Sequence, residues 1–241
     1  MDTNEPKARA SAKSGQPRMI PRIIGKLSLF VLALAAILFG ASGRWDWAMA
    51  WVFIAMLLAC VGVNILVLGR VNPEVLGERL QRRKSAKKWD KAVVFFIAVP
   101  WLALLLVAGL DRRFAASPPI APALRIAAMA LLVAGDLGFL WAMAVNAFFS
   151  RVVRIQEERG HHVVTAGPYQ YVRHPGYVSW LAMTAAVPII LGSLWALIPA
   201  SLAMALMVVR TALEDRMLRE ELVGYKDYAA RVRWRLLPGL W

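Results

Sequence analysis

The chain is poor in the residues that soluble enzymes and metalloproteins rely on. Charged residues make up only 18% of the 241 residues, which argues against an ordinary soluble domain. The single cysteine, Cys60, excludes a disulfide, a cysteine-rich metal site and a CxxC redox pair within the chain. The three histidines lack chelating spacing, and no GxSxG, Walker or Rossmann glycine pattern occurs. Neither metal-dependent chemistry nor a nucleotide-binding loop is therefore expected.

Apolar sequence is what the chain has in excess. Hydrophobic residues make up 59% of it, and the mean hydropathy is +0.54. A helix needs roughly 20 apolar residues to cross about 30 Å of hydrocarbon. The stretches that approach or exceed this length are Leu27–Gly43 (extended upstream by Ile23 and Ile24), Trp47–Gly69, Ala92–Leu110, Ile126–Ser150 and Gly176–Val209. The pattern predicts a membrane protein with several spans.

The last of these stretches, Gly176–Val209, is too long for one span. It holds 34 uncharged residues, which would extend over about 51 Å as a single helix. The segment "PIILGSLW", Pro188–Trp195, is the natural place for a turn. Pro175 fits the first turn of a helix with His174 near its N-cap, and Gly224 is the expected stop of the final helix. The expected fold is all-α: a polytopic integral membrane helical bundle of about six transmembrane segments with a C-terminal helical hairpin.

The net charge of +14 is distributed unevenly among the loops. When alternate loops are assigned to one side of the membrane, the other side keeps only four basic residues: Arg44, Arg112, Arg113 and Arg125. The positive-inside rule then places both termini in the cytoplasm, with the chain in the inner (cell) membrane. Topology and attraction to anionic lipid explain the charge, so the bilayer is an expected partner and nucleic acid is not.

The ends of the chain and the second loop each leave two interpretations. Residues 1–18 are expected to form a disordered cytoplasmic tail, and residues 19–241 a single membrane domain. A basic lead before the apolar run Leu27–Phe39 also fits a cleavable signal peptide, whose removal would leave five spans, but the long polar lead favours a retained span. The basic loop from Arg70 to Lys91 is either a topology-setting loop or an amphipathic surface helix. The apolar face of that helix would hold Val71, Val75, Leu76 and Leu80.

The stretch "TAGPYQYVRHPGYVSWL", Thr165–Leu181, places polar and basic side chains at the mouth of an apolar helix. A helix N-terminus attracts anions, and Arg173 adds a fixed fork of donors. His174 adds a group that donates or accepts near neutral pH. Aromatic faces with polar tips come from Tyr169, Tyr171 and Tyr177. These residues predict either a pocket for a small polar cofactor or an interfacial anchor at headgroup depth, and they do not separate the two.

Two further groups of polar residues are candidates for function. Arg210 and Glu214 share a helix face where the last apolar run ends, beside Asp215. Acids there would bind the hydroxyls or amine of a cofactor, although a series of surface ion pairs explains the same spacing. Asp136 lies within an apolar run, where a carboxylate is costly, with Asn64 and Asn146 as possible partners. A structural hydrogen-bonded role is favoured for it.

At these residues the sequence resembles the isoprenylcysteine carboxyl methyltransferase family. The resemblance rests on "GPYQYVRHPGY", followed about 40 residues later by "EDRMLREEL" and "GYKDYAARV", with "FFSRVVRIQEERGHHVVTAGPY" as the lead-in. Phospholipid methyltransferases carry a related core. The resemblance runs from Asn146 to the C-terminus and implies a cytoplasmic S-adenosylmethionine pocket built on membrane helices. Residues 146–241 would then be the cofactor-binding catalytic core.

The resemblance also implies roles for individual residues. Arg210 would lie near the methyl-transfer centre, and Arg173 is the second catalytic candidate. The residues implied in cofactor binding are Gly167, Pro168, Tyr169, Val172, His174, Pro175, Tyr177, Glu214 and Asp215. Asp215 stands where the family has a second glutamate. Gly176 and Ser179 also depart from the family pattern, which puts the shape of the pocket in question.

The implied activity is methyl transfer from S-adenosylmethionine to a lipid-like or small carboxylate, thiol or amine substrate. Because this cofactor is already activated, the protein mainly needs to position the reactants in a dry site. One alternative is an NADPH-dependent reductase of the sterol-reductase type, with Arg173 and the basic "RVRWRLL" serving the 2′-phosphate. A non-catalytic membrane scaffold is the other.

Overall fold

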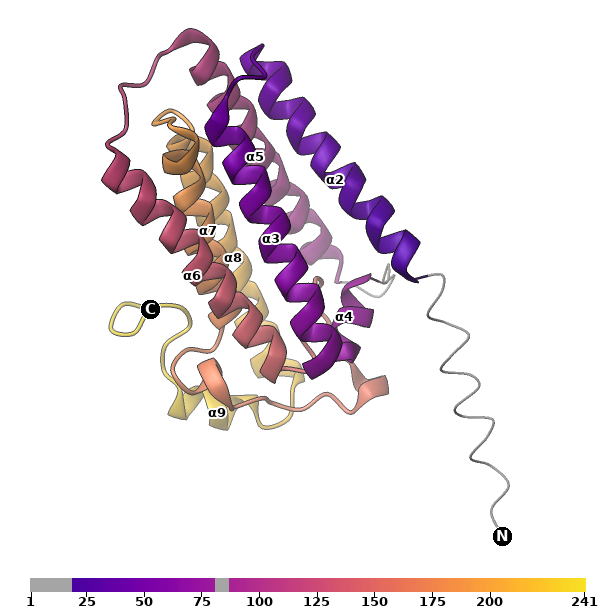
Figure 1. The fold of residues 1–241 in the computed structure, drawn as a ribbon. Helices are drawn as coiled ribbons and strands as arrows, with labels where there is room; N and C mark the ends of the chain where they lie inside the picture. Colours follow the sequence, from indigo (N-terminus) through magenta and orange to yellow (C-terminus); the bar gives the residue numbers. More distant parts are fainter. Residues whose placement is uncertain (1–18, 81–86) are drawn as a thin grey trace.

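The protein was analysed as a computed structural model, which describes residues 19–80 and 87–241. The expected tail at residues 1–18 lies outside the described residues. The long helices are α2 (Met19–Ser42), α3 (Ala48–Val71), α5 (Lys88–Phe114), α6 (Pro122–Val145), α7 (Pro175–Leu191) and α8 (Leu197–Glu221). The short helices are α4 (Pro73–Leu80), η1 (Glu157–Arg159), η2 (Gly167–Gln170) and α9 (Tyr225–Arg231). Figure 1 shows the long helices side by side in a bundle, with α4 and α9 gathered at one end. The described residues contain no strand, which confirms the all-α class.

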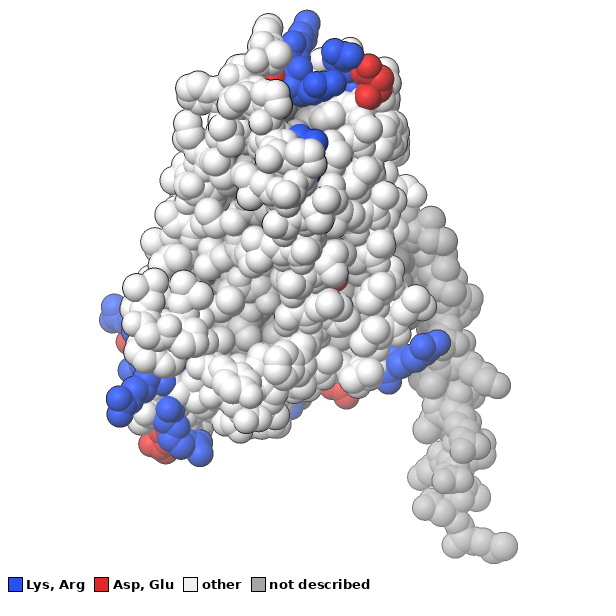
Figure 2. Space-filling view, turned by 60° about the vertical axis from the view of Figure 1, so that its left-hand side comes forward, with Lys and Arg blue, Asp and Glu red and all other residues white. Residues whose placement is uncertain are grey.

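The bundle has the surface of a membrane protein. Five helices are long and apolar enough to cross a membrane (α2, α3, α5, α6 and α8), and α7 is a shorter apolar helix. Figure 2 shows the charged side chains on this face gathered at the two ends of the molecule, with an uncharged band between them. The chain is therefore an integral, multi-pass membrane protein, while the exact count of six spans stays a prediction.

Helices α7 and α8 are joined within the stretch predicted to turn. Gly192 adopts φ +82°, in the left-handed region that favours glycine. The N–H of Ser193 donates to the carbonyl of Pro188 at 2.9 Å. The Ser193 hydroxyl donates to the Asp111 carboxylate at 2.5 Å, which fixes the turn to the end of α5. The connection places the start of α7 and the end of α8 at the same end of the bundle, beside α9 (Figure 1).

Helix α6 ends before the fourth apolar stretch of the sequence does. Helix α6 ends at Val145, five residues before Ser150. The reason is local: the Asn146 side-chain oxygen accepts the N–H of Phe148 at 2.9 Å and replaces a helical carbonyl as partner. The segment "RVVRIQ" at 151–156 forms neither helix nor strand. It crosses the end of the bundle as irregular chain and becomes a wall of the site.

Close packing of α2 against α5 depends on a glycine. A Cβ at Gly109 would lie 2.6 Å from the Cβ of Ala41 and 3.0 Å from the carbonyl oxygen of Leu38. Leu38 is fully buried in the main core cluster, so neither neighbour has room to move away. Helices α2 and α5 can approach this closely because Gly109 has no side-chain methyl group.

We expect Gly109→Ala to destabilise the protein by about 1–3 kcal/mol, because the added methyl overpacks the α2–α5 contact. Gly62→Ala is the matched control, since a Cβ at Gly62 would meet nothing within 4 Å. The midpoint of thermal unfolding in detergent measures both variants. Equal midpoints for the two variants would contradict this account of the packing.

Candidate active site

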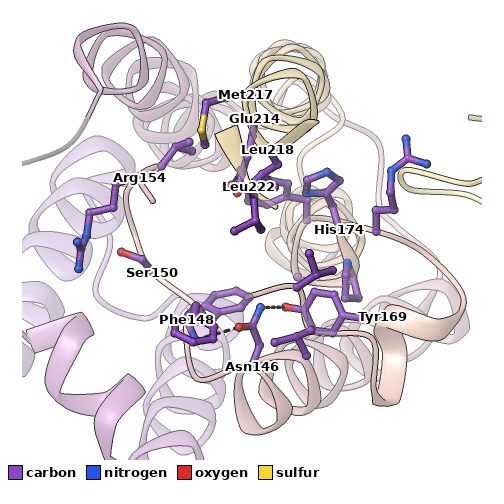
Figure 3. A pocket seen from close by; sticks show the side chains of 18 of the residues that line it. Asn146, Phe148, Ser150, Arg154, Tyr169, His174, Glu214, Met217, Leu218 and Leu222 are labelled. Carbon is purple, nitrogen blue, oxygen red and sulfur yellow. Dashed lines mark hydrogen bonds between the residues drawn. The ribbon is translucent and has the colours of Figure 1, made fainter. Parts of the chain in front are cut away.

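A cavity of about 270 Å³ lies at the end of the bundle that carries α4 and α9. Its walls come from the irregular segment after α6, the start of α7, the last turns of α8, and α9. Figure 3 shows Asn146 and Phe148 on one side of the cavity, with His174, Glu214, Leu218 and Leu222 on the other. Residues far apart in the sequence therefore meet around one space.

Tyr169 stands in the cavity wall and is held at both ends. Its hydroxyl accepts a hydrogen bond from the Asn146 amide at 3.0 Å, drawn in Figure 3. Its carbonyl accepts one from the hydroxyl of Tyr228 at 2.7 Å. Burial raises the pKa of Tyr169 above its ordinary value, so the phenol stays protonated. Asn146 therefore binds Tyr169 and not Asp136, one of the two partners considered for that aspartate.

The start of α7 is fixed to the C-terminal segment. His174 is the N-cap residue and Pro175 occupies the first turn, as the sequence predicted. The backbone N–H groups of Arg173 and His174 donate to the carbonyls of Trp234 and Arg235, at 2.9 and 3.0 Å. The His174 ring stacks on Tyr177, with ring centroids 5.7 Å apart and planes at 6°. The aromatic pair faces the cavity from a rigid helix end.

Asp215 lies behind the cavity wall as the centre of a buried charge cluster. Its carboxylate accepts from Nε and Nη2 of Arg173, at 2.7 and 3.2 Å. Arg219, Arg235 and the Tyr225 hydroxyl also donate to it, at 3.1, 3.0 and 3.0 Å. Burial first, and then the Asp215 charge, raise the pKa of Tyr225, so its hydroxyl remains a donor. The cluster joins α7, α8, α9 and the C-terminal segment.

Arg173 is fully engaged in this cluster. Besides its bonds to Asp215, its Nη1 donates to the carbonyls of Val232 and Arg233, at 2.7 and 2.8 Å. The side chain is 1% exposed. Arg173 contributes to the cavity wall, but Asp215 neutralises its charge and all three of its nitrogens donate within the cluster.

The face of α8 turned to the cavity carries Arg210 and Glu214. The Tyr177 hydroxyl donates to the Glu214 carboxylate, and the Arg210 guanidinium carbon lies 5.3 Å from the Tyr177 ring centroid. Arg210 does not form the expected ion pair with Glu214. Its Nε instead donates to Asp90 at 2.9 Å, and its Nη2 donates to the Arg151 carbonyl at 3.2 Å. Its Nη1 donates to no residue that the structure describes.

Sequence reasoning missed Asp90, the partner of Arg210. This carboxylate begins α5 and is fully buried. Its second oxygen accepts the N–H of Val153 at 2.8 Å, so one side chain holds both Arg210 and the irregular wall of the cavity. One clue to this residue is present in the sequence, an acid within the basic run "KKWDK". The positive-inside rule counts only the basic residues of a loop, so it gives no reason to single out the acid.

The site residues predicted from the sequence fall into two groups. Seven line the cavity: Tyr169, Arg173, His174, Pro175, Tyr177, Arg210 and Glu214. Four do not: Gly167, Pro168, Val172 and Asp215. Pro168 and Val172 are buried in the structure behind it. Gly167 has φ +59°, and a Cβ there would lie 3.1 Å from the Trp141 indole nitrogen. These residues shape η2, which presents Tyr169.

Hydrogen bonding and packing account for Asp136, Gly176 and Ser179. The Asn64 amide donates to Asp136 at 2.8 Å, which fits the structural role favoured for this carboxylate. A Cβ at Gly176 would lie 2.8 Å from the Phe149 ring, so the glycine leaves room for that ring at the cavity wall. The Ser179 hydroxyl fills the space beside Gly138 of α6.

His161 forms part of the opposite wall. Its ring lies against Phe148, with centroids 4.6 Å apart, and its Nδ1 accepts the N–H of Gln156 at 3.3 Å. Burial lowers the pKa of His161 to about 4, so the imidazole is neutral at pH 7. The described residues contain no group of three or more His, Cys, Asp and Glu residues placed to hold a metal ion.

Comparison with known proteins identifies the segment that builds most of this cavity. The family model of the isoprenylcysteine carboxyl methyltransferase (ICMT) family matches residues 127–220. This match confirms the resemblance predicted from the sequence, over the segment that holds both motifs. The ICMT segment ends before α9 and excludes Asp90, so the cavity uses residues on both sides of it.

Solved structures and curated proteins were also compared. The chain is similar to the structure of the eukaryotic intramembrane Ras methyltransferase ICMT, with a TM-score of 0.45 and 18% sequence identity. The similarity covers 90% of this chain and 86% of that one. A search of curated protein sequences gives no match. Nothing in the comparisons supports the reductase alternative.

Proposed function

We propose that the protein is an S-adenosylmethionine-dependent methyltransferase that acts at the membrane interface. The observation that carries the proposal is the meeting of two motifs around one cavity. His174 and Tyr177 come from the start of α7, and Arg210 and Glu214 from the end of α8. A headgroup anchor would not need these side chains to converge on one cavity. The ICMT match over residues 127–220 supports the same activity.

The cavity residues fit the cofactor by their chemistry. Glu214 offers a carboxylate for the amine or hydroxyl donors of S-adenosylmethionine. The parallel rings of His174 and Tyr177 offer faces for an adenine ring or a sulfonium. Leu218 and Leu222 add apolar surface to the cavity wall. When bound, the cofactor supplies an activated methyl group, and the cavity provides orientation and a dry site.

Arg210 is placed to orient the methyl acceptor. Asp90 fixes Nε, the Arg151 carbonyl fixes Nη2, and Nη1 donates to no described residue. A guanidinium held in this way can hydrogen-bond the acceptor without first losing side-chain freedom. Arg210 is thus the proposed catalytic residue. Arg173 and Asp215 are proposed to position the pocket, because their charges satisfy each other.

The proposed setting is the cytoplasmic face of the membrane, with both termini on that side and residues 19–241 forming one domain. The cavity lies at one end of the apolar bundle, where a lipid-like acceptor entering between the helices would bring its polar head to the cofactor. The NADPH alternative loses its main support, because Asp215 already neutralises the charge of Arg173 and the Arg173 side chain is 1% exposed.

Calorimetric titration of the purified chain in detergent tests the cofactor. S-adenosylmethionine is expected to bind the unaltered protein. Glu214→Gln is expected to weaken binding about ten- to hundredfold, because a charge-assisted hydrogen bond is lost. Glu220→Gln is the matched control, because Glu220 lies on the same helix, is exposed and does not line the cavity. Binding of NADPH without binding of S-adenosylmethionine would overturn the proposal.

A further inference from the structure

Two arginines line the cavity without an assigned role: Arg79 and Arg151. Arg79 comes from the last turn of α4, a helix anchored by the fully buried Val75. Its guanidinium carbon lies 5.4 Å from the Phe139 ring centroid and 5.7 Å from that of Phe149. The two rings hold the cation at the cavity wall, and with Val75 they place one face of α4 against the bundle, whereas Val71 belongs to α3 and is 62% exposed.

The positive charge at this wall is uncompensated. Neither Arg79 nor Arg151 forms an ion pair with an acidic residue in ranges 19–80 and 87–241. The neighbouring acids, Glu78 and Glu158, bind Arg154 at 3.2 and 2.6 Å. Burial first, and then repulsion from Arg151, lower the pKa of Arg79 to about 10. An anion in the cavity would relieve both effects.

Apolar residues line the cavity that contains the two arginines. The same cavity is lined by Arg210, the proposed catalytic residue. Phe139, Phe149 and Trp180 also line the cavity, so an apolar chain has aromatic surface to contact. Arg151 links the two cations: its Nη1 donates to the Arg79 carbonyl at 3.4 Å, and its own carbonyl accepts from Arg210 at 3.2 Å. A molecule bound at Arg79 therefore lies in the same cavity as the proposed catalytic residue, Arg210.

We propose that Arg79 and Arg151 form an oxyanion subsite that binds the carboxylate or phosphate head of an amphiphilic methyl acceptor, with its apolar part against Phe139, Phe149 and Trp180. The inference rests on the proposed function, because it names the substrate class of that site. Arginine suits this role, since its planar fork matches both carboxylate and phosphate. Arg79 lies outside the segment matched by the ICMT family, so this specificity belongs to the first half of the chain.

Binding of defined probes tests the subsite. The full chain is purified in a maltoside detergent and titrated with n-octyl phosphate, octanoate, octanol and inorganic phosphate. The two anionic amphiphiles are expected to bind about tenfold or more tightly than octanol, because each gains charge-assisted hydrogen bonds. Inorganic phosphate is expected to bind more weakly than octyl phosphate, because it lacks the apolar chain.

Variants assign the binding to the two arginines. Arg79→Gln is expected to weaken octyl phosphate binding about ten- to hundredfold, and Arg151→Gln by a smaller factor because Arg151 is more exposed. Arg70→Gln is the matched control: this arginine is exposed at the end of α3 and does not line the cavity. Arg79→Lys keeps the charge and is expected to recover part of the affinity.

The outcomes separate the subsite from the activity, because each sample is also titrated with S-adenosylmethionine. Equal binding of octanol and octyl phosphate, or unchanged anion binding in Arg79→Gln, would overturn the subsite even if the cofactor binds. Anion binding that depends on Arg79 without any cofactor binding would support the subsite and overturn the proposed function. If Arg79→Gln does not fold, unchanged anion binding in Arg151→Gln would overturn the subsite.

Discussion

The Asp90→Asn variant is expected to lose methyl transfer about hundredfold or more while its affinity for S-adenosylmethionine changes little. Asp90 does not line the cavity, and it acts through Arg210, whose Nε it accepts at 2.9 Å. An asparagine keeps an oxygen for the Val153 N–H but presents no charge to the guanidinium. Arg210 then retains its positive charge without a fixed direction, so the acceptor is bound in the wrong geometry.

A split between kcat and cofactor affinity distinguishes this positioning role from general destabilisation. Removing one partner of a buried ion pair costs about 3–5 kcal/mol, so the variant is also expected to unfold earlier. Asp90→Glu restores the charge and is expected to recover part of kcat. Asp227→Asn, at an exposed acid of α9, is the matched control. Unchanged kcat in folded Asp90→Asn would contradict the role given to this residue.

The Asp215→Asn variant is expected to lose about 3–5 kcal/mol of stability, a shift on the order of 10 °C in the midpoint of thermal unfolding. Asp215 and Arg173 are each 1% exposed, and the one carboxylate also accepts from Arg219 and Arg235. Without its charge, three guanidinium groups repel one another and Arg173 is left buried without a counter-ion. Cofactor binding is expected to fall with stability, because the cluster holds the start of α7.

An exposed ion pair on the same helix provides the comparison. Arg216 and Glu220 form an i,i+4 pair with side chains 78% and 58% exposed. Because water and salt screen such pairs, Glu220→Gln is expected to change stability by about 0.5 kcal/mol or less. Scanning fluorimetry of both variants in the same detergent measures the difference. Midpoints that agree within about 2 °C would show that the buried cluster adds no more than a surface pair.

The sequence predicts the bundle well because the bilayer imposes a simple rule on it. Long apolar runs must be helical to satisfy their backbone groups, so α3, α5 and α8 follow directly from hydropathy. The start of α7 is also predictable, because proline is favoured in the first turn of a helix and Pro175 follows a polar segment. The end of α6 is not, since it depends on one side chain, Asn146, capturing a single backbone N–H.

The sequence predicts which residues line the candidate site better than it predicts which hydrogen bonds and ion pairs they form. Spacing placed Arg210 and Glu214 on one helix face, and both line the cavity. The alternative in which they pair with each other is wrong, because Arg210 forms its ion pair with Asp90 instead. Long-range pairing of this kind leaves no periodic trace in a single sequence. The same holds for Arg79, which looked like one basic residue among many in a loop.

The bond between Asp90 and Arg210 also has a consequence for the order of synthesis. The two residues are separated by 120 positions in the chain. At about 5–20 residues per second, a ribosome needs on the order of ten seconds to make the second after the first. Throughout this interval Asp90 has no Arg210 to bind, while α5 already has to settle beside α2. The cavity is therefore completed only when the last long helix enters the membrane, and the early helices must persist without it until then.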